Sequence, residues 1–196
     1  MTAAATQTRQ QTSRHAVILP SLLWSRSRPD FYAVTCRLEA DGIRFRSAVV
    51  PTPGERLTCS IGLVGTLEVE VVRTADLAFT VKPVAGRQHN GAVARTLVDL
   101  AGRQTHRPGR HGTSPRIVPK RPELTVTLPD GTVLKGRLAE VSIARADVYL
   151  GVGIPVGTKI RLGATEAVVA HAFSNGIGAY FLSPLDPDAL DEGLVL

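Results

Sequence analysis

Two stretches decide the fold: CRLEADGIRFRSAVVPTPGERLTC at residues 36–59, and AEVSIARADVYLGVGIPVGTKIRL at residues 139–162. When the first is placed over the second without a gap, Gly42 falls on Arg145. Apolar residues and turn residues then recur in the same order in both stretches. A sequence that resembles itself at a fixed offset is the mark of a repeated structural unit, so we predict a duplication.

The similarity extends past these two stretches. Gly54 falls on Gly157 in the shared turn. Further on, residues 69–83 match residues 168–184 after a two-residue insertion, which places Phe79 on Tyr180. Strand, turn, strand and turn thus follow one another in both copies.

Each copy has the pattern of β-structure. Residues 123–128, ELTVTL, alternate polar and apolar side chains as a half-buried strand does. The tripeptide Pro129-Asp130-Gly131 is typical of a tight turn, and residues 132–138 return from it. Short strands separated by turns favour a small closed sheet. The predicted fold class is therefore all-β, with two small six-stranded barrels in tandem.

A helix is predicted after the first barrel. Val93, Leu97 and Leu100 share one helical face, Asn90 is a suitable N-cap, and Gly102 is a suitable end. The second copy ends in DPDALDEGLVL, which is too short for more than one helical turn.

The predicted domain boundaries follow from these elements. Residues 1–14 form a disordered tail, residues 15–103 barrel 1, residues 104–121 a basic arm, and residues 122–196 barrel 2. Residues 103–121 carry six Lys and Arg side chains and no acid, which equals the net charge of the whole chain, 23 − 17 = +6. The positive charge is thus concentrated in one linker-like segment that is rich in proline and glycine.

The composition excludes several classes of protein. Cys36 and Cys59 are too few for a disulfide framework, and neither they nor the five histidines have metal-ligand or triad spacing. No phosphate loop, metalloprotease or nucleophile-elbow motif occurs, so we predict no catalytic residue, no metal site and no enzyme.

The same totals bear on the compartment. No apolar run approaches the roughly 18 residues of a membrane span, and the first residues lack the apolar core of a signal peptide. The chain has 19 Arg and 4 Lys, a bias typical of GC-rich bacterial genomes. We therefore expect a bacterial cytoplasmic protein without a membrane span.

The second copy resembles PilZ domains. In that family a basic arm of the form RxxxR precedes a strand hairpin, and a D/N-x-S-x-x-G turn follows. Here Arg116 and Lys120 have the RxxxR spacing, Arg121 lies one residue farther on, and Glu140 and Ser142 lie in the turn. The resemblance implies a six-stranded barrel that binds the second messenger cyclic di-GMP and controls motility, exopolysaccharide synthesis or a similar output.

The resemblance also supplies a candidate site. The candidate ligand-binding residues are Arg116, Lys120, Arg121, Glu140, Ser142 and Arg145. Guanidinium groups can bridge phosphate oxygens and stack on bases, and a serine can bond to a guanine edge. Glu140 stands where Asp or Asn is expected, and Arg145 stands at the glycine position. In the first copy Arg37 and Glu39 hold both polar positions, so we expect no nucleotide at that turn. A structural or protein-docking role is expected for barrel 1.

Two classes of function remain. The first is a signalling regulator that binds cyclic di-GMP and acts through a protein partner, or an adaptor of the same fold that has lost nucleotide binding. The second is a basic nucleic-acid-binding protein. The second is disfavoured because only nine residues are aromatic, and no strand carries the spaced aromatic residues that stack bases.

Overall fold

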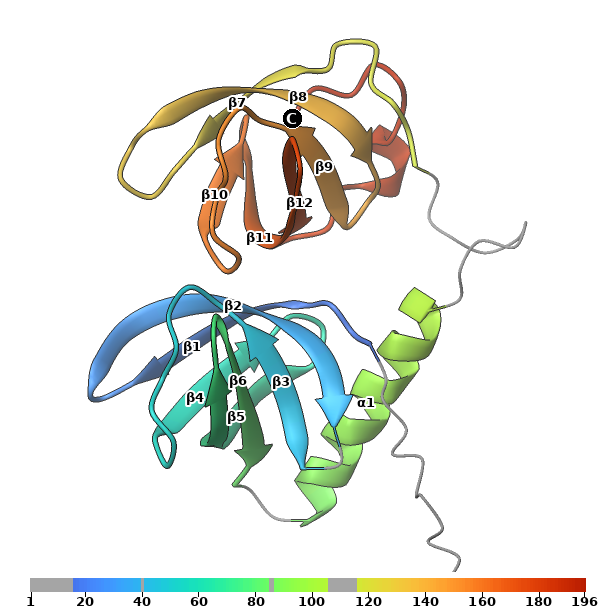
Figure 1. The fold of residues 1–196 in the computed structure, drawn as a ribbon. Coiled ribbons are helices and arrows are strands. Elements are labelled where there is room, and N and C mark those ends of the chain that lie inside the picture. The colour runs from blue at the N-terminus through green and yellow to red at the C-terminus, as the bar shows by residue number, and fades with distance from the viewer. Residues whose placement is uncertain (1–15, 40, 85–86, 106–115) are drawn as a thin grey trace, which may run out of the picture.

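The computed structural model describes residues 16–39, 41–84, 87–105 and 116–196, which form two closed barrels and a helix (Figure 1). The strands of barrel 1 are β1 (Pro20–Ser25), β2 (Arg28–Glu39), β3 (Gly42–Arg46), β4 (Arg56–Ile61), β5 (Gly65–Ala75) and β6 (Ala78–Pro83). The strands of barrel 2 are β7 (Glu123–Thr127), β8 (Val133–Val141), β9 (Arg145–Tyr149), β10 (Lys159–Leu162), β11 (Thr165–Phe173) and β12 (Gly176–Phe181). The predicted tail, 1–14, and residues 106–115 of the predicted arm lie outside the described residues.

The two barrels have the same topology. Barrel 1 closes in the order β1-β2-β3-β6-β5-β4, and barrel 2 has the equivalent order β7-β8-β9-β12-β11-β10. A bulge interrupts the β2–β3 and β8–β9 pairings, and another interrupts the β5–β6 and β11–β12 pairings. The prediction of an all-β fold with two six-stranded barrels is confirmed.

The aligned turn glycines explain why both copies fold alike. Gly54 and Gly157 have φ of 83° and 86°, a backbone conformation that a glycine adopts without strain. The Gly54 amide donates to the Val71 carbonyl at 2.7 Å, and the Gly157 amide donates to the Val169 carbonyl at 2.8 Å. Each glycine thus ties the segment before the fourth strand to the fifth strand of its barrel.

The predicted match of Phe79 to Tyr180 is wrong by three residues. Phe79 pairs with Phe45 on β3, whereas the residue at the equivalent place on β12 is Ile177, which pairs with Val148 on β9. The hairpin between β10 and β11 is shorter than that between β4 and β5, which changes the offset between the copies. Phe79 consequently points into its barrel, while Tyr180 lies among residues between the barrels.

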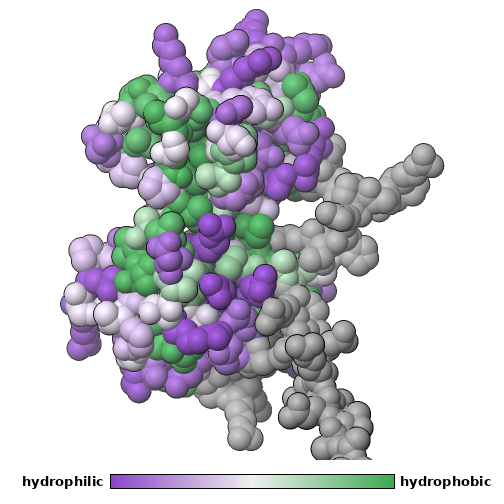
Figure 2. Space-filling model, in the orientation of Figure 1, coloured by the Kyte–Doolittle hydropathy of each residue, from purple (hydrophilic) through white to green (hydrophobic). Residues whose placement is uncertain are grey.

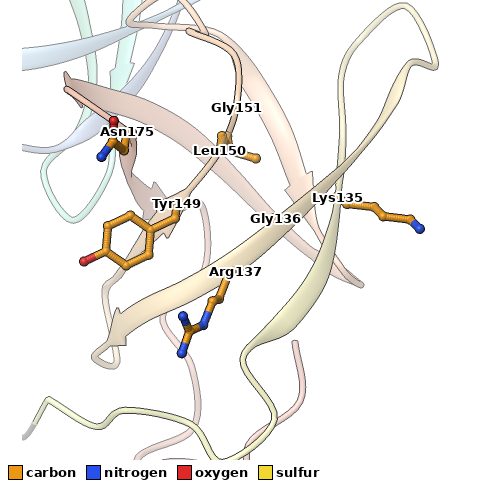
Figure 3. A pocket seen from close by; sticks show the side chains of 7 residues that line it. All are labelled: Lys135, Gly136, Arg137, Tyr149, Leu150, Gly151 and Asn175. Carbon is orange, nitrogen blue, oxygen red and sulfur yellow. The ribbon is translucent and has the colours of Figure 1, made fainter.

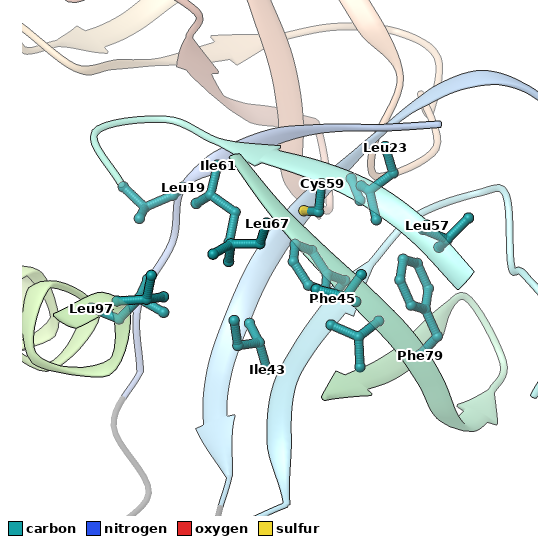
Figure 4. Packing of buried hydrophobic residues seen from close by; sticks show 14 of the residues in the cluster. Leu19, Leu23, Ile43, Phe45, Leu57, Cys59, Ile61, Leu67, Phe79 and Leu97 are labelled. Atoms are coloured by element: carbon teal, nitrogen blue, oxygen red, sulfur yellow. The ribbon is translucent and has the colours of Figure 1, made fainter. Parts of the chain in front are cut away.

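Alternating side chains fill each barrel. In barrel 1, Phe45 and Phe79 stack with ring centroids 5.4 Å apart, and aliphatic residues and Cys59 surround them (Figure 4). Barrel 2 encloses mainly smaller aliphatic residues, among them Val148 and Ile177. Both interiors are therefore packed with side chains.

The helix α1 (Arg87–Thr105) covers one end of barrel 1, where Val93, Leu97 and Ala101 join its core (Figures 1 and 4). The predicted ends were wrong, because the helix begins before Asn90 and continues through Gly102. A glycine inside a helix costs only about 1 kcal/mol, and burial of the apolar face on the barrel offsets that cost. None of the described helices combines the length and apolar character needed to cross a membrane.

Barrel 2 is covered by the end of the chain instead of a long helix. A 3-10 turn, η1 (Pro187–Ala189), interrupts this segment. Its partly buried leucines pack on the core of barrel 2: Leu185, Leu190, Leu194 and Leu196. The two copies thus close their barrels with different elements.

The barrels touch through a small apolar interface. Val34 of β2 packs with Val168 and Ala170 of β11, and hydrophobic atoms continue from one barrel to the other where they meet (Figure 2). The Ala48 amide donates to the Val156 carbonyl across this interface at 2.9 Å. β2 of barrel 1 and β11 of barrel 2 therefore lie side by side.

Candidate functional site

The end of the basic arm is held against barrel 2. Ile117 and Val141 form a two-way antiparallel bridge, with both N–H···O distances 2.9 Å. This bridge brings the Arg116 Nη1 atom to 3.1 Å from the Glu140 Oε2 atom. The pair is about half exposed, so water screens it. The arm and the turn residue predicted to act together are therefore neighbours in the structure.

Ser142 closes the turn between β8 and β9. Its amide donates to the Arg145 carbonyl at 2.8 Å, and its hydroxyl donates to the same carbonyl at 3.4 Å. The residue is buried, with 8% of its surface exposed. To reach a guanine edge, as predicted, the Ser142 hydroxyl has to turn away from this weak contact.

Arg145 fits at the position that glycine holds in barrel 1. Gly42 has a φ of 150°, and a Cβ there would lie 2.0 Å from the Val81 carbonyl oxygen. Arg145 is not among the described residues with positive φ, so its side chain is accommodated. Its Nη2 atom lies 3.4 Å from the Asp147 Oδ2 atom, which turns the guanidinium along the outer face of β9.

A histidine lies beyond Asp147 on the same face. The Asp147 Oδ1 atom is buried without a hydrogen-bond partner, and the His171 Nε2 atom is 3.9 Å from it. The His171 ring lies over Gly178, where a Cβ would be 2.0 Å from the ring. The outer face of barrel 2 thus carries a row of polar side chains that begins on the arm and continues over β8, β9 and β11. Its members are Arg116, Glu140, Arg145, Asp147 and His171.

The other two predicted arm residues have different surroundings. Lys120 is held by the C-terminal segment: its amide donates to the Glu192 carbonyl at 2.8 Å, and its Nζ atom is 3.0 Å from the Glu192 Oε2 atom. Arg121 is exposed and has no ion pair within the described residues. Of the predicted set, the structure brings together Arg116, Glu140, Ser142 and Arg145, while Lys120 is engaged elsewhere.

The equivalent face of barrel 1 has the opposite charge. Arg37 pairs with Arg44 across β2 and β3, where barrel 2 pairs Glu140 with Asp147. Arg73 of β5 bonds to Glu39 and to Asp41, so both carboxylates at the β2–β3 turn already have a partner. We expect no nucleotide at this turn, because Arg37 and Glu39 replace the polar side chains that would bond to a guanine edge, and Arg73 is already held by Glu39 and Asp41.

Sequence reasoning missed a hollow at the far end of the β8–β9 hairpin (Figure 3). Its volume is about 600 Å³, and its lining is Lys135, Gly136, Arg137, Tyr149, Leu150, Gly151 and Asn175. Arg137 and Tyr149 are directly opposite each other in the β8–β9 pairing. The alternation of polar and apolar residues in 145–149 is the signal that places Tyr149 on the outer face, whereas 133–137, VLKGR, give no comparable signal for Arg137.

The described residues contain no group of histidines, cysteines and carboxylates suited to a metal ion. Cys36 and Cys59 are free thiols. Burial raises the pKa of both thiols, although three nearby arginines partly oppose the effect at Cys36. Both thiols are thus held in the less nucleophilic, protonated form.

Comparison with known proteins gives no match by sequence, either to a protein family or to a curated protein. Solved structures do match. The Borreliella burgdorferi PlzA protein, solved in complex with c-di-GMP, is 11% identical with a TM-score of 0.32, and 86% of each chain is covered. The Bacillus subtilis inhibitor of motility, MotI/DgrA, is 12% identical with a TM-score of 0.30, covering 89% of this chain and 91% of that one.

A third solved structure is the MrkH–c-di-GMP complex of K. pneumonia. It is 9% identical with a TM-score of 0.27, and covers 83% of this chain and 78% of the other. Identities and TM-scores this low do not support a transfer of function, so the function of this chain rests on its own residues and geometry.

Proposed function

We propose that this chain is a non-enzymatic regulator of the bacterial cytoplasm whose second barrel binds cyclic di-GMP and passes the signal on through a protein partner. The ligand lies between the Arg116 end of the arm and the turn from Glu140 to Arg145. Barrel 1 contributes structure or a protein-docking surface.

The observation that carries this proposal is the bridge between Ile117 and Val141. It holds Arg116 next to β8, which leads into the turn from Glu140 to Arg145, so a phosphate-bearing ligand at this turn has guanidinium groups on the arm and on β9 available to it. Glu140 neutralises Arg116 in the absence of ligand. An exposed ion pair is worth only about 0–1 kcal/mol, so a dianionic ligand can displace Glu140 from Arg116 at small cost.

The adaptor alternative is favoured by contacts within barrel 2 and the arm that already occupy the candidate binding residues. Arg116 already pairs with Glu140, the Ser142 hydroxyl donates a hydrogen bond within its own turn, and Arg145 pairs with Asp147. If these contacts persist in the presence of cyclic di-GMP, the barrel has a closed surface and serves only to dock a protein.

Calorimetric titration with cyclic di-GMP tests the proposal. Losing one charge-assisted contact costs roughly 1.5–3 kcal/mol, so Arg116→Ala should weaken binding at least about tenfold. Arg161→Ala is the control: it removes one exposed arginine of barrel 2, on β10 and outside the proposed site, and should change affinity by less than about threefold. No heat from the unaltered chain at about 100 µM ligand, a concentration that detects micromolar binding, would leave the adaptor alternative.

A further inference from the structure

We propose that the hollow at the far end of the β8–β9 hairpin is a second ligand site, which takes a planar aromatic anion of mononucleotide size with its ring on Tyr149 and its phosphate on Arg137. This site is separate from the Arg116 edge and does not depend on it. The proposal rests on the shape of the hollow, on an exposed aromatic pair and on a cation without a partner.

The aromatic pair is built over a glycine. Tyr149 and Phe173 flank Gly176 across three adjacent strands, and their rings meet above it edge to face, with centroids 6.0 Å apart and planes at 88°. A Cβ at Gly176 would lie 2.8 Å from the Phe173 ring and 2.1 Å from the Val148 carbonyl oxygen. Glycine is therefore what lets Phe173 lie close to the strand and support Tyr149.

Both rings lie on the outside of the barrel and face solvent. Tyr149 is 48% exposed and Phe173 is 37% exposed. His171 contacts Phe173 at 6.2 Å between centroids and so continues the row along β11. A supported aromatic ring that keeps an open surface can stack any nucleobase, because every base has a π-face.

Arg137 supplies the charge beside this ring. Arg137 and Tyr149 lie next to each other on the side of the sheet shown in Figure 3, whereas Lys135 points away from them. Within the described part of the chain Arg137 has neither an ion pair nor a side-chain hydrogen bond. A guanidinium without a carboxylate is ready to bind a phosphate with two parallel bonds.

The remaining lining fixes the class of ligand. A Cβ at Gly151 would meet nothing within 4 Å, so the backbone is open to a ligand there, whereas a Cβ at Gly136 would point toward the core residues Val126 and Val148. Asn175 contributes an exposed amide that can donate to and accept from a base edge. The hollow is an open depression on the surface, so a ligand would lie on it with one side exposed, as a stacked base does. The Tyr149 ring, the Arg137 guanidinium and the Asn175 amide together suit a nucleoside phosphate better than an acidic peptide. An acidic peptide has no base to stack on the Tyr149 ring.

The experiment is a titration of the full chain, isotopically labelled for NMR, with GMP and with AMP, using guanosine and ribose 5-phosphate as probes that lack the phosphate or the base. We expect the amide signals of 136–137, 149–151 and 175 to shift with at least one nucleotide. Each truncated probe should bind at least about tenfold more weakly, because stacking and a charge-assisted contact are each worth about that factor.

Two variants and two controls locate the site. Arg137→Ala and Tyr149→Ala should each weaken nucleotide binding about tenfold or more. Arg161→Ala, an exposed arginine on β10, should leave it unchanged, and so should Arg116→Ala, which separates this site from the proposed cyclic di-GMP site. The proposal is overturned if neither nucleotide binds at about 5 mM, or if Arg137→Ala and Tyr149→Ala leave binding unaltered.

Discussion

The two barrels share a backbone plan and differ in what they show to the outside. Equivalent positions on the second and third strands hold Arg37 and Arg44 in barrel 1, and Glu140 and Asp147 in barrel 2. Inside, the same bulges and the same turn bonds recur. The fold is therefore maintained by turn glycines and inward-facing residues, while the outer faces have changed their charge. The two copies should accordingly differ in what they bind.

They also differ in how their open ends are covered, and the first prediction concerns this difference. Leu97 of α1 is 1% exposed against barrel 1, whereas the leucines that cover barrel 2 are only partly buried. Leu97→Ala should lower the free energy of unfolding of barrel 1 by about 2–5 kcal/mol. Leu190→Ala should cost barrel 2 less, about 1 kcal/mol.

Urea unfolding measures both variants, by tryptophan fluorescence for barrel 1 and by far-UV circular dichroism for the whole chain. Trp24 on β1 is the sole tryptophan in the sequence, so its fluorescence reports on barrel 1. Val98→Ala is the matched control for Leu97→Ala, because Val98 is exposed on the same helix. If the two helix variants unfold at the same urea concentration, α1 does not complete the core of barrel 1.

The second prediction compares the two turn glycines. A Cβ at Gly54 meets nothing within 4 Å, but a Cβ at Gly157 would lie 2.8 Å from the Tyr32 carbonyl oxygen of the other barrel. Gly54→Ala should cost about 1–2 kcal/mol for its left-handed backbone alone. Gly157→Ala should cost more, about 3 kcal/mol, because it also strains the contact between the barrels. If Gly54→Ala and Gly157→Ala have equal midpoints of thermal unfolding, the barrels are not in close contact at Gly157.

The third prediction is the pH effect of one ion pair in barrel 1. Arg28 donates two hydrogen bonds to Glu55, which lowers the pKa of that carboxyl below its ordinary 4.5, and Thr52 adds a backbone bond. Because the folded pKa is depressed, this stabilisation is present above about pH 4.5 and is lost as the pH falls through the folded pKa. The equivalent residue of barrel 2 is the uncharged Thr158.

Glu55→Gln should therefore cost barrel 1 about 1 kcal/mol at pH 7 and progressively less on acidification. Tryptophan-detected unfolding between pH 7 and pH 3 measures the effect. If the free energy of unfolding differs between variant and unaltered chain by the same amount over that range, the Arg28–Glu55 pair does not stabilise barrel 1.

Particular residues show how much of this could be predicted from sequence. The aligned glycines and the alternation of apolar residues were sufficient for two six-stranded barrels, because both features are local. The match of Phe79 to Tyr180 failed because a shorter hairpin changes register without leaving a local signal. The helix ends failed because burial against the barrel overrides an internal glycine at Gly102.

The candidate site divides in the same way. That Arg116 would meet Glu140 could be predicted, because the arm directly precedes the barrel that carries the turn. That Lys120 pairs with Glu192 depends on where the end of the chain returns, which spacing does not reveal. The hollow beside Arg137 was missed because it needs Tyr149 and Asn175 from a neighbouring strand and a loop.

The most direct test of the difference between the barrels is to map cyclic di-GMP on the isotopically labelled chain by amide shifts in NMR spectra. The account predicts saturable shifts at Ile117 and from Glu140 to Arg145, with the equivalent segment of barrel 1, residues 37–42, unchanged. Shifts confined to residues 37–42, or no shifts at all at about 1 mM ligand, would contradict it.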